Sequence, residues 1–154
     1  MHDRIARISL ESPNQSEVIS LIEQLDAYQK PLYPAESYHG IDIDALSDEN
    51  ALFAVARAGA GQVVACGAIV LEPDYGEVKR MFTVPSFRGR GIAGRLLAFL
   101  ESEARSRGCQ RFMLETGFRQ VEAIALYARF GYERCGPFGD YAADPNSVFM
   151  AKFS

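Results

Sequence analysis

Glycine and arginine residues are concentrated between Arg88 and Arg95, in the segment Arg-Gly-Arg-Gly-Ile-Ala-Gly-Arg. The residue pattern predicts a strand that ends at Val84, just before the segment, and a helix that begins at Ile92 within it. Glycine lets the backbone pass close to a ligand, and the free N–H groups at the start of a helix can hold an anion. Because the arginines add positive charge, the segment predicts a binding site for a phosphate compound.

Two nucleotide-binding motifs share letters with this segment. Its three glycines spell G-x-G-x-x-G, and Glu115 ends the next predicted strand, where a dinucleotide-binding fold places an acidic residue. However, Pro-Ser-Phe-Arg separates the glycines from their strand, and only 60 residues follow Gly94, too few for the rest of such a fold. The P-loop motif also fails, because Arg95 and Leu96 stand where it needs Lys and then Ser or Thr. Both motifs are therefore disfavoured.

The elements that must position the segment predict one mixed sheet. Predicted strands cover residues 4–10, 52–57, 63–71, 77–84, 110–116, 132–135 and 148–153. Predicted helices cover residues 16–28, with Asn14 or Ser16 as the cap, and residues 41–46, 92–107 and 121–130. A mostly antiparallel meander precedes the segment and a β-α-β unit spans it. We therefore expect a single domain, residues 1–154, of the α/β (α+β) class, with one mixed, mostly antiparallel sheet of about six to seven strands and helices on both faces.

Composition narrows the function classes. A net charge of −4 argues against general binding to nucleic acid, which needs a basic surface. No apolar stretch has the length of a signal peptide or a membrane span, so no membrane partner is expected. The cysteines Cys66, Cys109 and Cys135 form no C-x-x-C pair, which predicts reduced thiols, buried as small apolar side chains, in a cytoplasmic protein. No metal site is expected, because His2 and His39 are isolated.

The segment and a second motif together resemble the GNAT (Gcn5-related) N-acetyltransferase family. Residues 88–93 match R-x-x-G-x-A, a form of the family's [QR]-x-x-G-x-[GA] signature, and Val84 and Pro85 precede it at the usual spacing. Residues 123–132, Ala-x-x-Leu-Tyr-x-x-x-Gly-Tyr, resemble the family's A-x-x-L-Y-x-x-x-G-F. Residues 32–37 and 136–147 resemble a bacterial subgroup of acetyltransferases related to YsnE. The resemblance thus implies an acyltransferase with the GNAT-like fold.

The resemblance implies that acetyl-CoA is the co-substrate and that no metal takes part. Its pyrophosphate would be held at the loop and helix start, by Arg88, Gly89, Arg90, Gly91, Ile92, Ala93 and Gly94. The pantetheine arm would run along the backbone of Met81, Phe82, Thr83 and Val84, where this strand separates from the strand of residues 111–116. Gln120 stands where the family often has Asn and is the candidate for a contact with the pantetheine amide.

Three residues are the candidates for the chemistry that the resemblance implies. Tyr127 occupies the position of the family's general acid, and a phenol with an ordinary pKa of about 10 can donate a proton to the leaving thiolate. An amine acceptor arrives protonated and must lose a proton, for which Glu77 is the first candidate base and Glu115 the second. A non-catalytic CoA-binding module and a protein or peptide N-acetyltransferase remain as alternatives.

The acceptor is expected to be a small-molecule amine. Its pocket would be formed by the N-terminal helices, the loop of residues 30–40 and a second irregular segment, with these candidates: Tyr33, Glu36, Ser37, Tyr38, His39, Asp140 and Tyr141. Glu36 and Asp140 would suit a cationic group on the acceptor. An exposed strand edge near the C-terminal end also predicts a homodimer.

Overall fold

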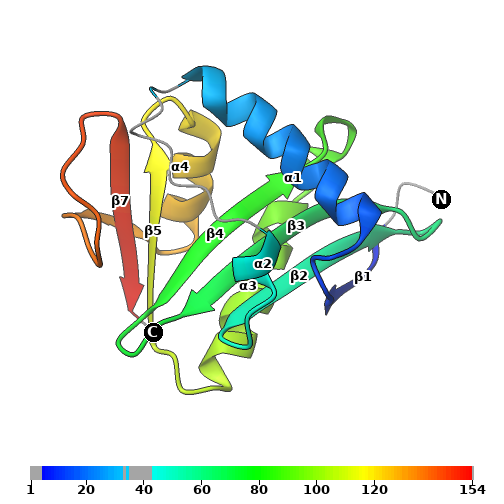
Figure 1. The fold of residues 1–154 in the computed structure, drawn as a ribbon, viewed down its shortest axis with the longest axis horizontal. Helices are drawn as coiled ribbons and strands as arrows, with labels where there is room; N and C mark the ends of the chain where they lie inside the picture. Colours follow the sequence, from blue (N-terminus) through cyan, green and yellow to red (C-terminus); the bar gives the residue numbers. More distant parts are fainter. Residues whose placement is uncertain (1–4, 33, 35–42, 154) are drawn as a thin grey trace.

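The computed structural model describes residues 5–32, 34 and 43–153, and in this part of the chain seven strands form one sheet. The strands are β1 (Ile5–Leu10), β2 (Ala51–Ala58), β3 (Val63–Leu71), β4 (Gly76–Thr83), β5 (Arg111–Gly117), β6 (Glu133–Cys135) and β7 (Ser147–Phe153). They lie in the order β1-β2-β3-β4-β5-β7-β6, and β4 and β5 are parallel whereas the other neighbours are antiparallel. The predicted mixed sheet is therefore confirmed (Figure 1).

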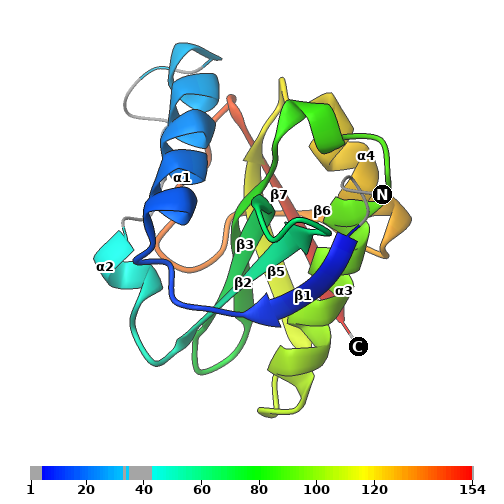
Figure 2. The ribbon, with the colours of Figure 1, turned by 90° about the vertical axis from the view of Figure 1, so that its right-hand side faces the viewer.

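Helices cover both faces of the sheet, as predicted. They are α1 (Ser16–Gln29), α2 (Ile43–Leu46), α3 (Ile92–Arg105) and α4 (Val121–Arg129), with single turns of 3₁₀-helix, η1 (Lys30–Leu32) and η3 (Pro85–Phe87). Figure 2 shows α1 and α2 on one face and α3 and α4 on the other. Successive side chains of β2 point to opposite faces of the sheet. Phe53 and Val55 pack in the core under α1, and Ala54 and Ala56 pack in the core under α3.

The parallel strands β4 and β5 pair only at their beginnings. Three residue pairs join them, of which Val78 and Leu114 form the last, although β4 continues to Thr83 and β5 to Gly117. Figure 1 shows the two strands diverging beyond this point. The separation expected from the family resemblance is thus present, and it leaves one edge of β4 without a strand partner among the described residues.

A β-bulge in β4 lies at the start of this separation. Between the pairs that β3 and β4 form on either side, β4 has Arg80 and Met81 where β3 has only Gly67. A Cβ atom at Gly67 would overlap the sulfur of Met81, and Arg80 has a positive φ of 60°. The Arg80 guanidinium reaches α1 and forms a 2.7 Å ion pair with Asp26. The bulge therefore contacts β3 through Met81 and α1 through Arg80.

Two local predictions are wrong. The cap of α1 is Gln15, without a side-chain cap bond, because the Gln15 amide instead donates to Ser12 O at 2.8 Å and to Glu11 Oε1 at 3.1 Å. Cys135 is exposed rather than buried, since it lies in β6, the three-residue strand at the edge of the sheet. Cys66 is buried as expected, and burial raises the pKa of its thiol to about 12.

Candidate active site

The glycine-rich segment forms an exposed turn that leads into α3. Gly89 and Gly91 have positive φ angles of 78° and 79°, in the left-handed region that glycine tolerates best, and Gly91 is the cap of α3. The first hydrogen bond of the helix runs from the Arg95 N–H to Gly91 O at 3.2 Å. The N–H groups of Ile92 and Ala93 come before this bond in the chain and have no acceptor within the helix. The helix start thus offers N–H donors and the positive end of its dipole to an anion.

Two arginines of the turn are held in place by carbonyl groups and aromatic rings. Arg88 Nε donates to Thr83 O at 2.9 Å, and its guanidinium lies 5.3 Å from the centre of the Phe82 ring. Arg90 donates to Ser86 O at 3.2 Å and lies 4.9 Å from the centre of the Phe87 ring. Cation–π contacts of this kind restrain the two side chains at the start of α3.

The third glycine of the segment, Gly94, is required for a different structural reason. Gly94 is buried inside the first turn of α3, and a Cβ atom there would lie 2.5 Å from Cζ of Phe130. In contrast, a Cβ atom at Gly89 or Gly91 would meet nothing within 4 Å. Gly94 is therefore required by the packing of α3 against Phe130, while Gly89 and Gly91 are required by backbone conformation.

The residues expected along the pantetheine arm lie on the unpaired edge of β4. Their side chains point to both faces: Met81 packs against the core under α3, and Phe82 packs in the core under α1. Val84 follows the strand and donates its N–H to Val64 O at 2.9 Å. Gln120 lies across the opening, before α4, where its side-chain oxygen accepts the Gly117 N–H at 2.9 Å and so closes the turn after β5.

Tyr127 lies in α4, which Figure 1 shows beside the diverging ends of β4 and β5. Tyr127 is 6% exposed, and its ring packs edge-on against the ring of Tyr132, with the two ring centroids 5.6 Å apart. Burial raises the pKa of the Tyr127 phenol, so the hydroxyl is protonated at neutral pH. Within the described part of the chain this hydroxyl makes no hydrogen bond, which leaves its proton for a ligand.

A buried polar group, here called the α3 cluster, adjoins Tyr127. It consists of Glu101, Tyr132 and Lys152. The Tyr132 hydroxyl donates to Glu101 Oε2 at 2.7 Å, and Lys152 Nζ donates to Glu101 Oε1 at 2.9 Å. Arg105 adds a longer contact of 3.5 Å to the same Oε1 atom. The α3 cluster therefore ties α3 to β7 through a carboxylate whose two oxygens are both engaged.

A second polar group, here called the β4 cluster, lies on the opposite face of the sheet. It consists of Glu77, Lys79 and Tyr141, and it faces the α1 side because the intervening Val78 packs in the core under α3. Tyr141 donates its hydroxyl to Glu77 Oε2 at 2.5 Å, and Lys79 Nζ donates to Glu77 Oε2 at 3.2 Å and to Tyr141 Oη at 3.0 Å. Both burial and the Glu77 carboxylate raise the pKa of Tyr141, which remains a neutral donor.

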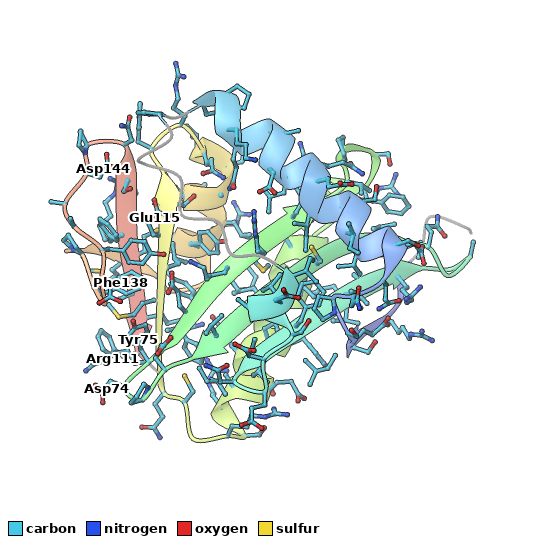
Figure 3. The ribbon with its side chains drawn as sticks, in the orientation of Figure 1. Asp74, Tyr75, Arg111, Glu115, Phe138 and Asp144 are labelled. Carbon is cyan, nitrogen blue, oxygen red and sulfur yellow. The ribbon has the colours of Figure 1, made fainter. Side chains whose placement is uncertain are left out.

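Glu115 flanks the same opening from β5. It lies two residues beyond Met113, the partner of Glu77, and therefore on the same face of the sheet. Ser147 Oγ donates to Glu115 Oε2 at 2.8 Å, and the charge of Glu115 contributes to the raised pKa of Tyr141. Figure 3 shows Glu115 toward the far end of β5 from Arg111, where the strand begins. The structure thus brings both candidate bases to one face, one on each side of the opening.

The other residues proposed for the acceptor pocket divide into two groups. Tyr33, Glu36, Ser37, Tyr38 and His39 lie outside the described residues. Asp140 is exposed, and Tyr141 belongs to the β4 cluster. Sequence reasoning missed Lys79 and also Phe138, whose ring centroid lies 5.0 Å from that of Tyr141. The close spacing of the aromatic residues Phe138 and Tyr141 in the sequence was the available signal.

Two kinds of feature are absent from the described residues. None of their helices is long and apolar enough to cross a membrane. Nor do they contain a group of three or more His, Cys, Asp and Glu side chains arranged to hold a metal ion.

The strand separation, the turn before α3 and the tyrosine of α4 define the chain as an acyltransferase of the GNAT class. The model of the acetyltransferase (GNAT) family matches residues 18–132, and the chain belongs to this family. Among its relatives, IAA acetyltransferase of Azospirillum brasilense is 50% identical over 147 residues, which cover 94% of this chain and 95% of that protein. The uncharacterized N-acetyltransferase YsnE of Bacillus subtilis (strain 168) is 35% identical over 148 residues, covering 94% and 97%.

A solved structure supports the fold. A Klebsiella pneumoniae protein described as an acyl-CoA N-acyltransferase superposes with a TM-score of 0.84 and 38% identity, over 98% of each chain. The predicted family, the resemblance to YsnE and the sheet architecture are therefore confirmed, and the chain is an acetyl-CoA-dependent acyltransferase.

Proposed function

We propose that this enzyme transfers the acetyl group of acetyl-CoA to a primary amine of a small molecule by direct attack, with Tyr127 as the general acid. The observation that carries the proposal is the Tyr127 phenol, which is buried, protonated and without a hydrogen-bond partner in the described part of the chain, beside the opening between β4 and β5. The name of the Azospirillum relative, IAA acetyltransferase, supports a small molecule as the acceptor.

The donor would bind along the opening and the turn that follows it. The backbone of Gly89 to Ala93 would offer N–H groups to the pyrophosphate, and Arg88 and Arg90 would supply positive charge nearby. The unpaired edge of Met81 to Val84 offers backbone groups to the pantetheine amides. Gln120 already uses its side-chain oxygen in the turn after β5, so its NH₂ group is the part that would face the arm. Gly94 would act through the packing that fixes the helix start.

In the reaction the acceptor nitrogen loses two protons and the leaving sulfur gains one. Glu77, directly or through a water molecule, takes the proton of the acceptor ammonium, and the neutral amine then attacks the thioester carbonyl carbon. As the carbon–sulfur bond breaks, the Tyr127 hydroxyl donates its proton to the leaving thiolate. The nitrogen then loses its second proton, which returns to the Tyr127 phenolate directly or through a water molecule and restores the phenol. Glu115, held by Ser147 across the opening, is the second candidate for the base.

The Tyr127→Phe variant tests this proposal. We expect kcat to fall by roughly 10²–10⁴-fold, because the ring is retained and only the proton donor is lost, with the KM for acetyl-CoA within about twofold of wild type. Thiol release measured with primary amines, amino acids and IAA would report turnover. The exposed Tyr28→Phe on α1 is the matched control and should leave turnover unchanged.

The same acceptor panel separates the alternatives. Wild-type turnover in Tyr127→Phe would remove Tyr127 from the mechanism. Binding of acetyl-CoA to the wild-type protein without transfer to any compound would favour a binding module, and transfer only to peptides would favour a protein acetyltransferase.

A further inference from the structure

Among the residues that the structure describes, those that contact Glu77 hold it through only one of its two carboxylate oxygens. Both Tyr141, at 2.5 Å, and Lys79, at 3.2 Å, donate to Oε2. The Glu77 side chain is 12% exposed, and its Oε1 atom makes no hydrogen bond to any residue that the structure describes. A carboxylate oxygen can accept further hydrogen bonds, so the contacts orient the group while Oε1 keeps its full capacity as an acceptor.

Tyr141 is held against Glu77 by an aromatic cluster that anchors the segment between β6 and β7. The centre of this cluster is Phe138, whose ring centroid lies 5.0 Å from that of Tyr141, 5.5 Å from that of Tyr75 and 5.9 Å from that of Phe149. Figure 3 shows Phe138 next to Tyr75. Gly139 has a positive φ of 56°, and a Cβ atom there would lie 2.6 Å from the Tyr75 hydroxyl. The segment is thus fitted closely against the β3–β4 turn and β7.

We propose that Tyr141, together with Lys79, is a positioning residue for Glu77. The two side chains hold Oε2, which leaves Oε1 to receive the proton of the acceptor ammonium, while the Tyr141 hydroxyl keeps its own proton. The segment between β6 and β7 therefore belongs to the acceptor side of the active site. This inference rests on the proposed role of Glu77 as the base, and it concerns how that base is oriented.

A double-mutant cycle of Tyr141→Phe and Glu77→Gln tests the inference. We expect Tyr141→Phe to lower kcat/KM for the acceptor by about tenfold in the wild-type background, because it retains the ring but frees the carboxylate to rotate. In the Glu77→Gln background the same change should alter kcat/KM by less than about twofold, since no base remains to be oriented. The KM for acetyl-CoA should stay unchanged in both backgrounds.

Two comparison variants accompany the cycle. Tyr75→Phe removes another phenol of the same aromatic cluster and should stay within about twofold of wild type. Lys79→Met removes the second donor to Oε2 and should repeat the behaviour of Tyr141→Phe. If Tyr141→Phe does not fold, as judged by circular dichroism, the cycle of Lys79→Met with Glu77→Gln decides the question.

The outcomes distinguish this inference from the proposed function. An equal loss from Tyr141→Phe in both backgrounds would mean that Tyr141 acts on the structure in general and would overturn the inference. Wild-type rates for Tyr141→Phe and Lys79→Met, with Glu77→Gln impaired, would overturn it while leaving Glu77 as the base. Wild-type rates for Glu77→Gln itself would overturn the role of Glu77 and the inference together.

Discussion

The α3 cluster and the β4 cluster contain the same three residue types on opposite faces of one sheet. In each cluster a tyrosine hydroxyl donates to a glutamate, and a lysine donates to the same carboxylate. In each, the lysine Nζ also lies 5.7 Å from the centre of the tyrosine ring. Residue types therefore do not distinguish the two clusters.

The clusters differ in how completely the carboxylate is satisfied. The Glu101 side chain is 3% exposed, and it accepts bonds at both oxygens. The Glu77 side chain is 12% exposed, and both of its contacts fall on Oε2. A fully buried charge must have all its partners within the protein, because a missing partner costs several kcal/mol. The contacts of the α3 cluster are thus those that stability requires, whereas the β4 cluster keeps an acceptor atom for the chemistry that we propose.

The largest effect is expected for Glu101→Ala. The change leaves Lys152 and Tyr132 with polar groups that face a cavity, so we expect the free energy of unfolding to fall by about 3–5 kcal/mol. Urea unfolding followed by circular dichroism measures this loss. The control is Glu103→Ala on the same helix, whose 3.2 Å ion pair with Arg107 is partly exposed and should change stability by less than about 1 kcal/mol.

The activity of Glu101→Ala then sharpens the comparison. Under conditions where the variant is folded, its kcat should remain within about threefold of wild type, because the Tyr132 ring that packs against Tyr127 is retained and Glu77 lies on the opposite face of the sheet. A stable Glu101→Ala protein with kcat reduced a hundredfold or more would break the comparison and place the α3 cluster in the active site.

The sequence could predict the elements of this fold because their periodicities are strong. The apolar residues of β3 predict a strand over 63–71, which is the observed strand Val63–Leu71. The sequence also predicted that a helix begins at Ile92 and that Tyr127 lies within a helix, since each motif is local, and both helices are observed. Gly91 and Gly94 look equivalent in the motif, but one needs a positive φ and the other a close contact with Phe130. That difference depends on tertiary packing, which no local pattern contains.

The contacts of the β4 cluster could not be predicted in the same way. Lys79 and Tyr141 are 62 residues apart in the chain. Their meeting depends on how Phe138 packs against Tyr75 and Phe149, which are themselves distant in sequence. The bulge at Arg80 adds a further change of face within β4 that alternation of residue types does not reveal.

The two lysines give the next largest effect. Lys152→Met should lower the free energy of unfolding by about 2 kcal/mol, less than Glu101→Ala, because Tyr132 and Arg105 still contact the carboxylate. Lys79→Met should change stability by less than about 1 kcal/mol but lower kcat/KM for the acceptor by about tenfold. Urea unfolding measures the free energy of unfolding of each variant, and steady-state kinetics measures its kcat/KM for the acceptor. The reverse assignment, with kinetics affected by Lys152→Met and stability by Lys79→Met, would contradict the comparison.

The smallest effect is the pH dependence of the contribution from Tyr132. Burial and the Glu101 carboxylate raise the pKa of Tyr132 above its ordinary value of 10.0. The folded state therefore favours the neutral phenol, and the stabilisation is fully present below the pKa of the unfolded chain and is lost as the pH rises above it. We expect Tyr132→Phe to be less stable than wild type by about 1 kcal/mol at about pH 8, and the difference to shrink by about pH 10.5.

Urea unfolding at both pH values measures the change, with the exposed Tyr28→Phe as the control for general alkaline effects. A difference that stays constant across this range would mean that the Tyr132 hydroxyl is not held by Glu101, and would remove the phenol from the α3 cluster.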